Sequence, residues 1–171
     1  MQSLTPLYDP QAVRWMWEEL TSCGIEPLTQ PEQVDQALTR QGTTLVVVNS
    51  VCGCAAGNAR PGVTRALQHP NIPDHLVTVF AGVDRAATDK ARKYMAGIPP
   101  SSPAIGLFKD GNLVHMLERR HIERMTEQDV AQNLEAAFDQ HCSRPGPSVP
   151  REHYEKVVHA RVCGSSIPRL A

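Results

Sequence analysis

The N-terminal forty residues show the hydrophobic pattern of two amphipathic helices. In residues 10–22 the apolar side chains recur three and four positions apart and form one helical stripe, made of Val13, Met16, Trp17 and Leu20. Asp9 can cap this helix, and Pro10 suits its first position. A second helix is predicted over residues 31–40, where one face carries Val34, Ala37 and Leu38. Two helices therefore precede the first predicted strand.

The pattern changes at residues 44–50, a short and nearly continuous run of β-branched and apolar side chains. This continuity is typical of a strand that is buried on both faces, as in the centre of a parallel or mixed sheet. Residues 55–68 predict a helix with a kink near Arg60, because Pro61 removes a backbone donor. A second strand is predicted over residues 76–81.

The remaining core elements are a helix, a hairpin and a last helix. Asp84 is placed to cap the first of these helices, one face of which carries Ala87, Ala91, Tyr94 and Met95. Strands over residues 104–108 and 112–117 flank an Asp-Gly pair, a strong hairpin signal. Thr126 opens the last helix in a capping box with Asp129. With a right-handed crossover, this order predicts an α/β, thioredoxin-like fold, in which helices flank a central mixed four-stranded sheet.

The composition changes after Cys142. Residues 144–150 contain three prolines and one glycine and predict an extended linker. A short helix is predicted over residues 152–159, with a small apolar face of Tyr154, Val157 and Val158. We therefore divide the chain into a thioredoxin-like domain, residues 1–142, and an extension, residues 143–171. The extension is expected to lie on this domain or on a second subunit and to add stability but no essential catalytic group.

Composition and charge exclude several classes of function. The chain has seventeen Lys and Arg residues and eighteen Asp and Glu residues. The resulting net charge of −1 favours neither nucleic acid nor anionic lipid as a partner. No apolar run approaches the roughly 18 residues of a membrane helix, and no export signal is readable. We expect a soluble, cytoplasmic protein with no nucleic-acid or membrane partner. Whether it forms a homodimer is left open.

The candidate chemistry lies in five cysteines: Cys23, Cys52, Cys54, Cys142 and Cys163. An odd number without an export signal argues against a secreted disulfide scaffold. Cys52 and Cys54 follow a buried strand at the start of a helix, where free amides and the helix dipole favour a thiolate. Residues two apart in an extended chain have Cα atoms about 6.6–7 Å apart. A disulfide between them therefore needs a bend, which Gly53 permits, and such a small ring is expected to be strained and easily reduced.

Redox chemistry is favoured for this pair, but other interpretations stay open. A free cysteine also packs as a small hydrophobic side chain, which is the interpretation we favour for Cys23 in the first helix. Zinc usually takes a second closely spaced sulfur pair, whereas Cys142 and Cys163 stand alone, so no metal site is predicted. The alternative to an enzyme is a non-catalytic thioredoxin-like module that docks a partner or holds zinc.

Pro103 adds a second observation. In thioredoxin-like folds a cis-proline precedes the strand that faces the redox pair, and Pro103 directly precedes the strand predicted over residues 104–108. The alternative is an ordinary trans turn, since only about 5–6% of X-Pro bonds are cis. The position of Pro103 in the order of elements favours the cis form.

The run TTLVVVNSVCGCAAGNARP, residues 43–61, resembles the signature of the bacilliredoxins. Four further stretches match the same family: residues 99–103, Val114-His115, Arg120-His121 and residues 136–142. The resemblance covers about residues 8–142. It implies a thioredoxin-like fold and removal of bacillithiol, or an equivalent low-molecular-weight thiol, from mixed disulfides on S-thiolated client proteins. Disulfide isomerase activity is also attributed to the family. The thiol is a co-substrate, and no bound cofactor is implied.

The resemblance also implies roles for individual residues. Cys52 matches the cysteine that attacks and takes up the thiol, and Cys54 matches the resolving cysteine, so we expect Cys52 to be more exposed and more acidic than Cys54. Pro103 matches the cis-proline that faces them and, with Gly53, is expected to position the substrate. Cys163 lies in the extension, beyond the shorter members of the family.

Other polar residues receive ordinary interpretations. Arg60 is expected on a solvated helix face rather than at a substrate carboxylate. His121 is interpreted as a surface side chain rather than a proton relay. Residues 118–120 form a charge run that we expect to be solvated.

Overall fold

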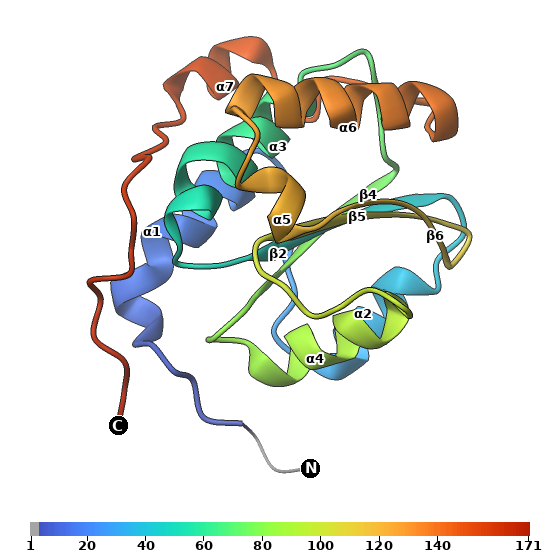
Figure 1. The fold of residues 1–171 in the computed structure, drawn as a ribbon. Helices are drawn as coiled ribbons and strands as arrows, with labels where there is room; N and C mark the ends of the chain where they lie inside the picture. The colour runs from blue at the N-terminus through green and yellow to red at the C-terminus, as the bar shows by residue number, and fades with distance from the viewer. Residues whose placement is uncertain (1–3) are drawn as a thin grey trace.

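A mixed β-sheet forms the centre of the computed structural model, which describes residues 4–171 (Figure 1). Its middle strand is β2 (Thr43–Asn49), which pairs in parallel with β4 (His75–Phe80) and antiparallel with β5 (Ala104–Lys109). The hairpin partner of β5 is β6 (Asn112–Leu117). Asp110 and Gly111 at the hairpin turn both have positive φ angles, as the Asp-Gly signal predicts.

The sheet has five strands rather than the predicted four, in the order β1-β4-β2-β5-β6. The additional strand, β1 (Glu26–Pro27), pairs in parallel with the outer edge of β4. It has only two residues, and both are exposed. A hydrophobic pattern cannot reveal such a strand, because its formation depends on the edge that β4 offers.

Helices cover both faces of the sheet (Figure 1). One face packs against α2 (Pro31–Leu38) and α4 (Arg85–Tyr94), and the other against α3 (Arg60–Ala66) and α6 (Glu127–His141). Along β2 the side chains alternate between the two sides: Leu45 and Val47 join the α3 and α6 cluster, whereas Val46 and Val48 join the α2 and α4 cluster. The predicted burial of this strand on both faces is confirmed.

The first helix, α1 (Pro10–Thr21), begins as predicted with an Asp9 side chain that accepts a hydrogen bond from the Gln11 amide. Thr126 and Asp129 form the predicted capping box of α6. Asp84 occupies the position before α4, but its side chain makes no capping bond, so that part of the prediction is wrong. No helix within residues 4–171 is long and apolar enough to span a membrane.

The predicted kink near Arg60 is a change of helix type. The chain forms a π-helical turn, η1 (Ala55–Ala59), and then continues as α3. A π-turn often marks a functional site within a helix. Gly62 then lets α3 approach α6 closely, because an added Cβ would lie 2.6 Å from Cγ1 of Val130.

The extension lies along the thioredoxin-like body, as expected (Figure 1). Its start pairs as β7 (Arg144–Pro145) with β3 (Asn71–Ile72), so the predicted linker contains a short strand. In the helix that follows, α7 (Arg151–Lys156), no side chain is fully buried. Of the predicted apolar face, Tyr154 and Val157 are half-buried, whereas Val158 is 81% exposed, so this face packs only in part. Residues 1–3 of the predicted domain lie outside the described residues.

Hydrogen bonds attach the extension to the body. The His159 ring bonds to the Thr64 hydroxyl with an N–O distance of 2.9 Å. The Leu170 amide donates to the Leu7 carbonyl at 2.7 Å, beside an isolated β-bridge between Tyr8 and Arg169. These bonds bring the last residues of the chain next to its first described ones.

Candidate active site

Cys52, Gly53 and Cys54 lie where β2 ends and η1 begins. The amides of Ala55 and Ala56 both donate to the Cys52 carbonyl, so the chain bends directly from the strand into the helical turn. This bend brings the Sγ atoms of Cys52 and Cys54 to 2.9 Å from each other. The sequence predicted that the cysteines lie at a junction between a strand and a helix and that the chain bends there, and both features are present.

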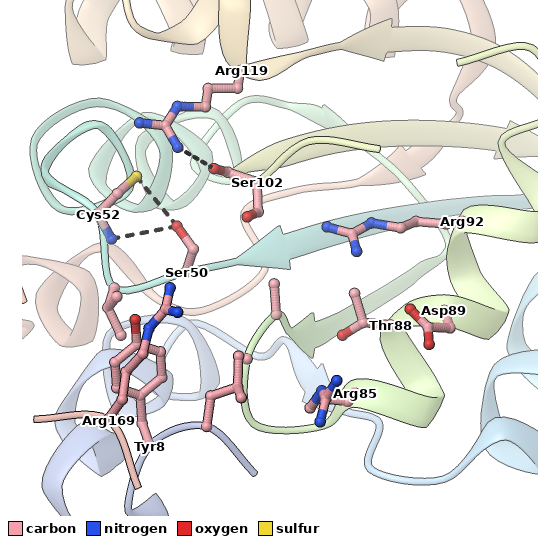
Figure 2. Close-up of a pocket in the computed structure, with 14 residues that line it drawn as sticks. Tyr8, Ser50, Cys52, Arg85, Thr88, Asp89, Arg92, Ser102, Arg119 and Arg169 are labelled. Carbon is pink, nitrogen blue, oxygen red and sulfur yellow. Dashed lines mark hydrogen bonds between the residues drawn. The ribbon is translucent and has the colours of Figure 1, made fainter. Parts of the chain in front are cut away.

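The surroundings of Cys52 favour its thiolate. Burial alone would raise the pKa of this thiol, but the neighbouring Cys54 thiol, the Ser50 hydroxyl, the Ala55 amide and the positive charge of Arg119 more than offset it. The Ser50 hydroxyl donates to Cys52 Sγ at 3.2 Å (Figure 2). The pKa of Cys52 therefore lies below the ordinary value of a cysteine.

Cys54 behaves in the opposite way. Burial, the hydrogen bond with Cys52 and the negative charge of a Cys52 thiolate raise the pKa of Cys54 to about 12. The expected difference in acidity is confirmed in direction. Both residues are half-buried, so residue exposure does not separate them, but only Cys52 lines the adjacent cavity.

Pro103 directly precedes β5, opposite the end of β2. The Ser102–Pro103 peptide bond is cis, as predicted. Ala104 pairs with Val48 in the sheet, which places the turn across from the cysteine motif. Ser102 and Cys52 line the same cavity.

Arg60 is fully buried, which corrects the prediction of a solvated side chain. Its Nε donates to Glu19 at 2.8 Å, and its Nη1 donates to Asn49 Oδ1 at 3.0 Å and to the Ser50 carbonyl at 2.9 Å. Arg60 thus holds the end of β2, directly before the cysteines. Glu19 was a signal for the burial of Arg60. Its carboxylate lies beside Leu20 on the buried face of α1, and a buried carboxylate needs a partner of opposite charge.

The charge run at residues 118–120 is only partly solvated, contrary to the prediction. Glu118 is 8% exposed and its amide donates to His121 Nδ1 at 3.0 Å, which closes a capping box on α5 (Arg119–Ile122). His121 is therefore a local cap. Arg119 points away from this cap, donates to the Ser102 carbonyl at 3.3 Å and lowers the pKa of Cys52.

A cavity of about 360 Å³ opens beside Cys52 (Figure 2). Its charged lining residues come from three separate parts of the chain: Arg85, Asp89 and Arg92 of α4, Arg119 of α5 and Arg169 of the extension. None of these five side chains was predicted as a site residue. They are scattered over 85 positions of the sequence and therefore form no local pattern.

The other cysteines have different environments. Cys23 is fully buried, which raises the pKa of its thiol to about 11 and fits the predicted packing role. Cys142 is also buried, whereas Cys163 is exposed and lies beside Gly53. Among residues 4–171 no group of three or more His, Cys, Asp and Glu side chains is arranged to hold a metal ion.

An acidified thiol, paired with a second thiol at the end of the central strand of a thioredoxin-like fold, defines a thiol-disulfide oxidoreductase. Comparison with solved structures agrees on the fold. A structure described as having a thioredoxin fold superposes with a TM-score of 0.51 and 19% identity, over 69% of this chain and 98% of that chain.

The family is shown by sequence comparison. The family described as Disulphide isomerase matches residues 8–142. A protein of Cytophaga hutchinsonii named Bacilliredoxin is 52% identical over 134 residues, 78% of this chain and 99% of that protein. A Bacilliredoxin of Geobacillus kaustophilus is 51% identical over 137 residues, 80% of this chain and 94% of its own. The chain belongs to the bacilliredoxin family, and the match to the family description ends at Cys142, before the extension begins.

Proposed function

We propose that this oxidoreductase removes a low-molecular-weight thiol, bacillithiol or an equivalent, from mixed disulfides on S-thiolated client proteins in the cytoplasm. The observation that carries the proposal is the difference between two thiols 2.9 Å apart, Cys52 with a lowered pKa and Cys54 with a raised one. Cys52 can therefore react as a thiolate, whereas Cys54 stays protonated as long as Cys52 is a thiolate.

In the first step the Cys52 thiolate attacks the sulfur of the low-molecular-weight thiol in the mixed disulfide. A bond forms between these two sulfurs, the bond to the client cysteine breaks, and the client thiolate leaves and takes up a proton. The client is reduced, and Cys52 carries the thiol as an adduct. Because the Cys52 thiolate is weakly basic, it is also a good leaving group when an external thiol attacks the small-thiol sulfur of this adduct.

Formation of the adduct changes the environment of Cys54. Two of the causes that raise its pKa, the hydrogen bond and the charge of the Cys52 thiolate, are lost when Cys52 is bound in a disulfide. Cys54 can then lose its proton and attack Cys52 Sγ, which expels the small thiol and leaves a Cys52–Cys54 disulfide. Two equivalents of an external thiol return this disulfide to the dithiol.

Disulfide isomerisation is a second candidate activity, supported by the description of the matching family. There Cys52 would attack a protein disulfide, form a mixed disulfide with the client, and be released when another client thiol attacks. No net oxidation or reduction occurs, and Cys54 would serve only to release a trapped client.

The test uses a client protein that carries a mixed disulfide with a small thiol. Cys52→Ser should abolish thiol release, whereas Cys54→Ser should accumulate the adduct on Cys52, visible as a mass increase equal to the thiol. External thiol can still turn the Cys54→Ser variant over slowly. An unmodified Cys52 in that variant after incubation contradicts the mechanism. A wild-type protein that binds the client but releases no thiol favours the non-catalytic alternative.

A further inference from the structure

We propose that the cavity beside Cys52 selects low-molecular-weight thiols that carry carboxylate groups, and that Arg169 of the extension completes the carboxylate site together with Arg92. The inference rests on the proposed function, because it assumes that the sulfur of the small thiol reacts at Cys52.

The charge of the cavity lining is strongly unbalanced. The lining contains four guanidinium groups and a single carboxylate, that of Asp89, although the whole chain carries a net charge of only −1. Figure 2 shows Arg92, Arg119 and Arg169 around the space in front of Cys52 and Ser50. Guanidinium groups bind carboxylates through two parallel hydrogen bonds, which makes such a lining selective for anions.

Two of the four arginines are free to bind a ligand. Arg119 lies 3.7 Å from Glu123 and donates to the Ser102 carbonyl, and Arg85 donates to the Thr5 carbonyl at 3.1 Å. Within residues 4–171, by contrast, neither Arg92 nor Arg169 forms an ion pair.

The hydrogen-bonding capacity of Arg92 is also largely unused. Its Nε is buried without a partner among the described residues, and the one hydrogen bond of its side chain within residues 4–171, from Nη2 to the Ser101 carbonyl, measures 3.5 Å.

Thr88 independently indicates that this cavity binds a polar ligand. Its side chain lines the cavity and is 2% exposed, yet its hydroxyl has no hydrogen-bond partner within residues 4–171. A buried hydroxyl without a partner is costly, so native structures usually supply one. Thr88 lies between Arg85 and Arg92 on the inner face of α4 (Figure 2), where a bound carboxylate would accept its hydrogen bond.

The size and origin of the cavity set the class of ligand. A volume of about 360 Å³ suits a small molecule and excludes a folded client chain. Arg92 comes from the thioredoxin-like body, whereas Arg169 lies outside the region that the family shares, residues 8–142. The selectivity is therefore expected only when the extension is in place.

The test compares three mixed disulfides on one client: mercaptosuccinate with two carboxylates, 2-mercaptoethanol with none, and cysteamine with a positive charge. The wild-type protein should release mercaptosuccinate with at least about tenfold higher kcat/KM than 2-mercaptoethanol, and cysteamine most slowly. Arg92→Gln and Arg169→Gln should each reduce this preference about fivefold or more, because the KM for the mercaptosuccinate disulfide rises more than the KM for the 2-mercaptoethanol disulfide.

Arg151→Gln is the matched control, because Arg151 belongs to the same extension, has a side chain that is 83% exposed and does not line this cavity. It should retain the full preference. Equal release of the three thiols by the wild-type protein, or a preference unchanged in both Arg92→Gln and Arg169→Gln, overturns the inference while leaving the proposed function intact.

A readout without turnover separates the two proposals. In the Cys52→Ser protein under reducing conditions, mercaptosuccinate should shift the NMR signals of Thr88 and Arg92, and 2-mercaptoethanol should not. If the wild-type protein released no thiol but these shifts appeared and were lost in Arg169→Gln, the proposed function would fail and the anion site would stand. No shift overturns the site.

Discussion

The two sides of Cys52 are built differently. On the side of the thioredoxin-like body, the end of β2 is held by Arg60, which is fully buried with Glu19 and bonded to Asn49 and Ser50. On the other side the extension approaches through backbone bonds, such as that from the Gly164 amide to the Val51 carbonyl at 2.7 Å. Its residues there, Cys163 among them, are mostly exposed.

This difference separates two tasks at one site. A buried ionic network can be broken only at high cost, so the body keeps the reacting sulfurs in a constant geometry. The extension beside Cys52 has mostly exposed side chains apart from the buried Gly164, and a segment with so little burial opens more easily. The body is thus suited to the exchange chemistry, and the extension to the choice of thiol.

The largest expected effect comes from removing one partner of the buried pair. Arg60→Met leaves the Glu19 carboxylate buried without its cation, and we expect the free energy of unfolding to fall by about 3–5 kcal/mol. Urea unfolding followed by circular dichroism measures this. The double variant Glu19→Leu/Arg60→Met should regain part of the loss, because it leaves no unpaired charge. A cost below about 1 kcal/mol for Arg60→Met would show that the network does not hold the site.

Truncation after Cys142 should have a smaller effect. It removes the β3–β7 pair and the bonds of His159 and Gly164 but little apolar burial, so we expect a loss of about 1–3 kcal/mol. Thermal unfolding and release of 2-mercaptoethanol measure the two properties separately. Release of this neutral thiol should be retained. A folded truncated protein that has lost it would show that the extension carries chemistry.

A cross-link tests the contact between the two sides without removing either. A Cβ atom at Gly53 would lie 3.6 Å from Cys163 Cβ, within the range of about 3.5–4.5 Å for a disulfide. In a Cys52→Ser/Cys54→Ser background, Gly53→Cys should therefore oxidise with Cys163, seen by mass spectrometry as the loss of two hydrogen atoms. Gly57→Cys in the same background, where no atom lies within 4 Å of the added Cβ, is the control. Equal oxidation of both variants would refute the contact.

The smallest expected effect concerns the acidity of Cys52. Ser50→Ala removes the hydroxyl that donates to the Cys52 thiolate, so the pKa of Cys52 should rise, by about one unit or less. Since a higher pKa leaves less thiolate at neutral pH, alkylation at pH 7 should slow and the midpoint of its pH profile should move upward. Ser165→Ala, beside Cys163, should leave the Cys52 profile unchanged. A midpoint that stays or falls contradicts the assignment.

The elements that could be predicted share a local origin. The stripe of α1, the capping box of α6, the Asp-Gly hairpin and the continuous apolar run of β2 all arise from residues within a few positions of each other. The cysteine motif belongs to this class too, because its bend and its place at a helix start follow from the residues around Gly53.

The errors have the opposite origin. Arg60 was assigned to solvent because its neighbours in sequence describe only its helix, whereas its partner Glu19 lies 41 positions away. The two-residue strand β1 exists only because β4 offers a free edge. The acidity of Cys52 depends partly on Arg119, and the cavity on Arg92 and Arg169, which arrive on three separate segments.

By itself, the sequence determined the order of helices and strands, the burial of β2 and the position of two thiols at its end, since hydrophobic period, capping and turn chemistry act over one or two turns of chain. The tertiary structure alone decided which charges are buried together at Arg60 and which collect around Cys52. The physical reason is that electrostatic and hydrogen-bond energies depend on distance in space and on burial, and neither is fixed until the distant segments have packed.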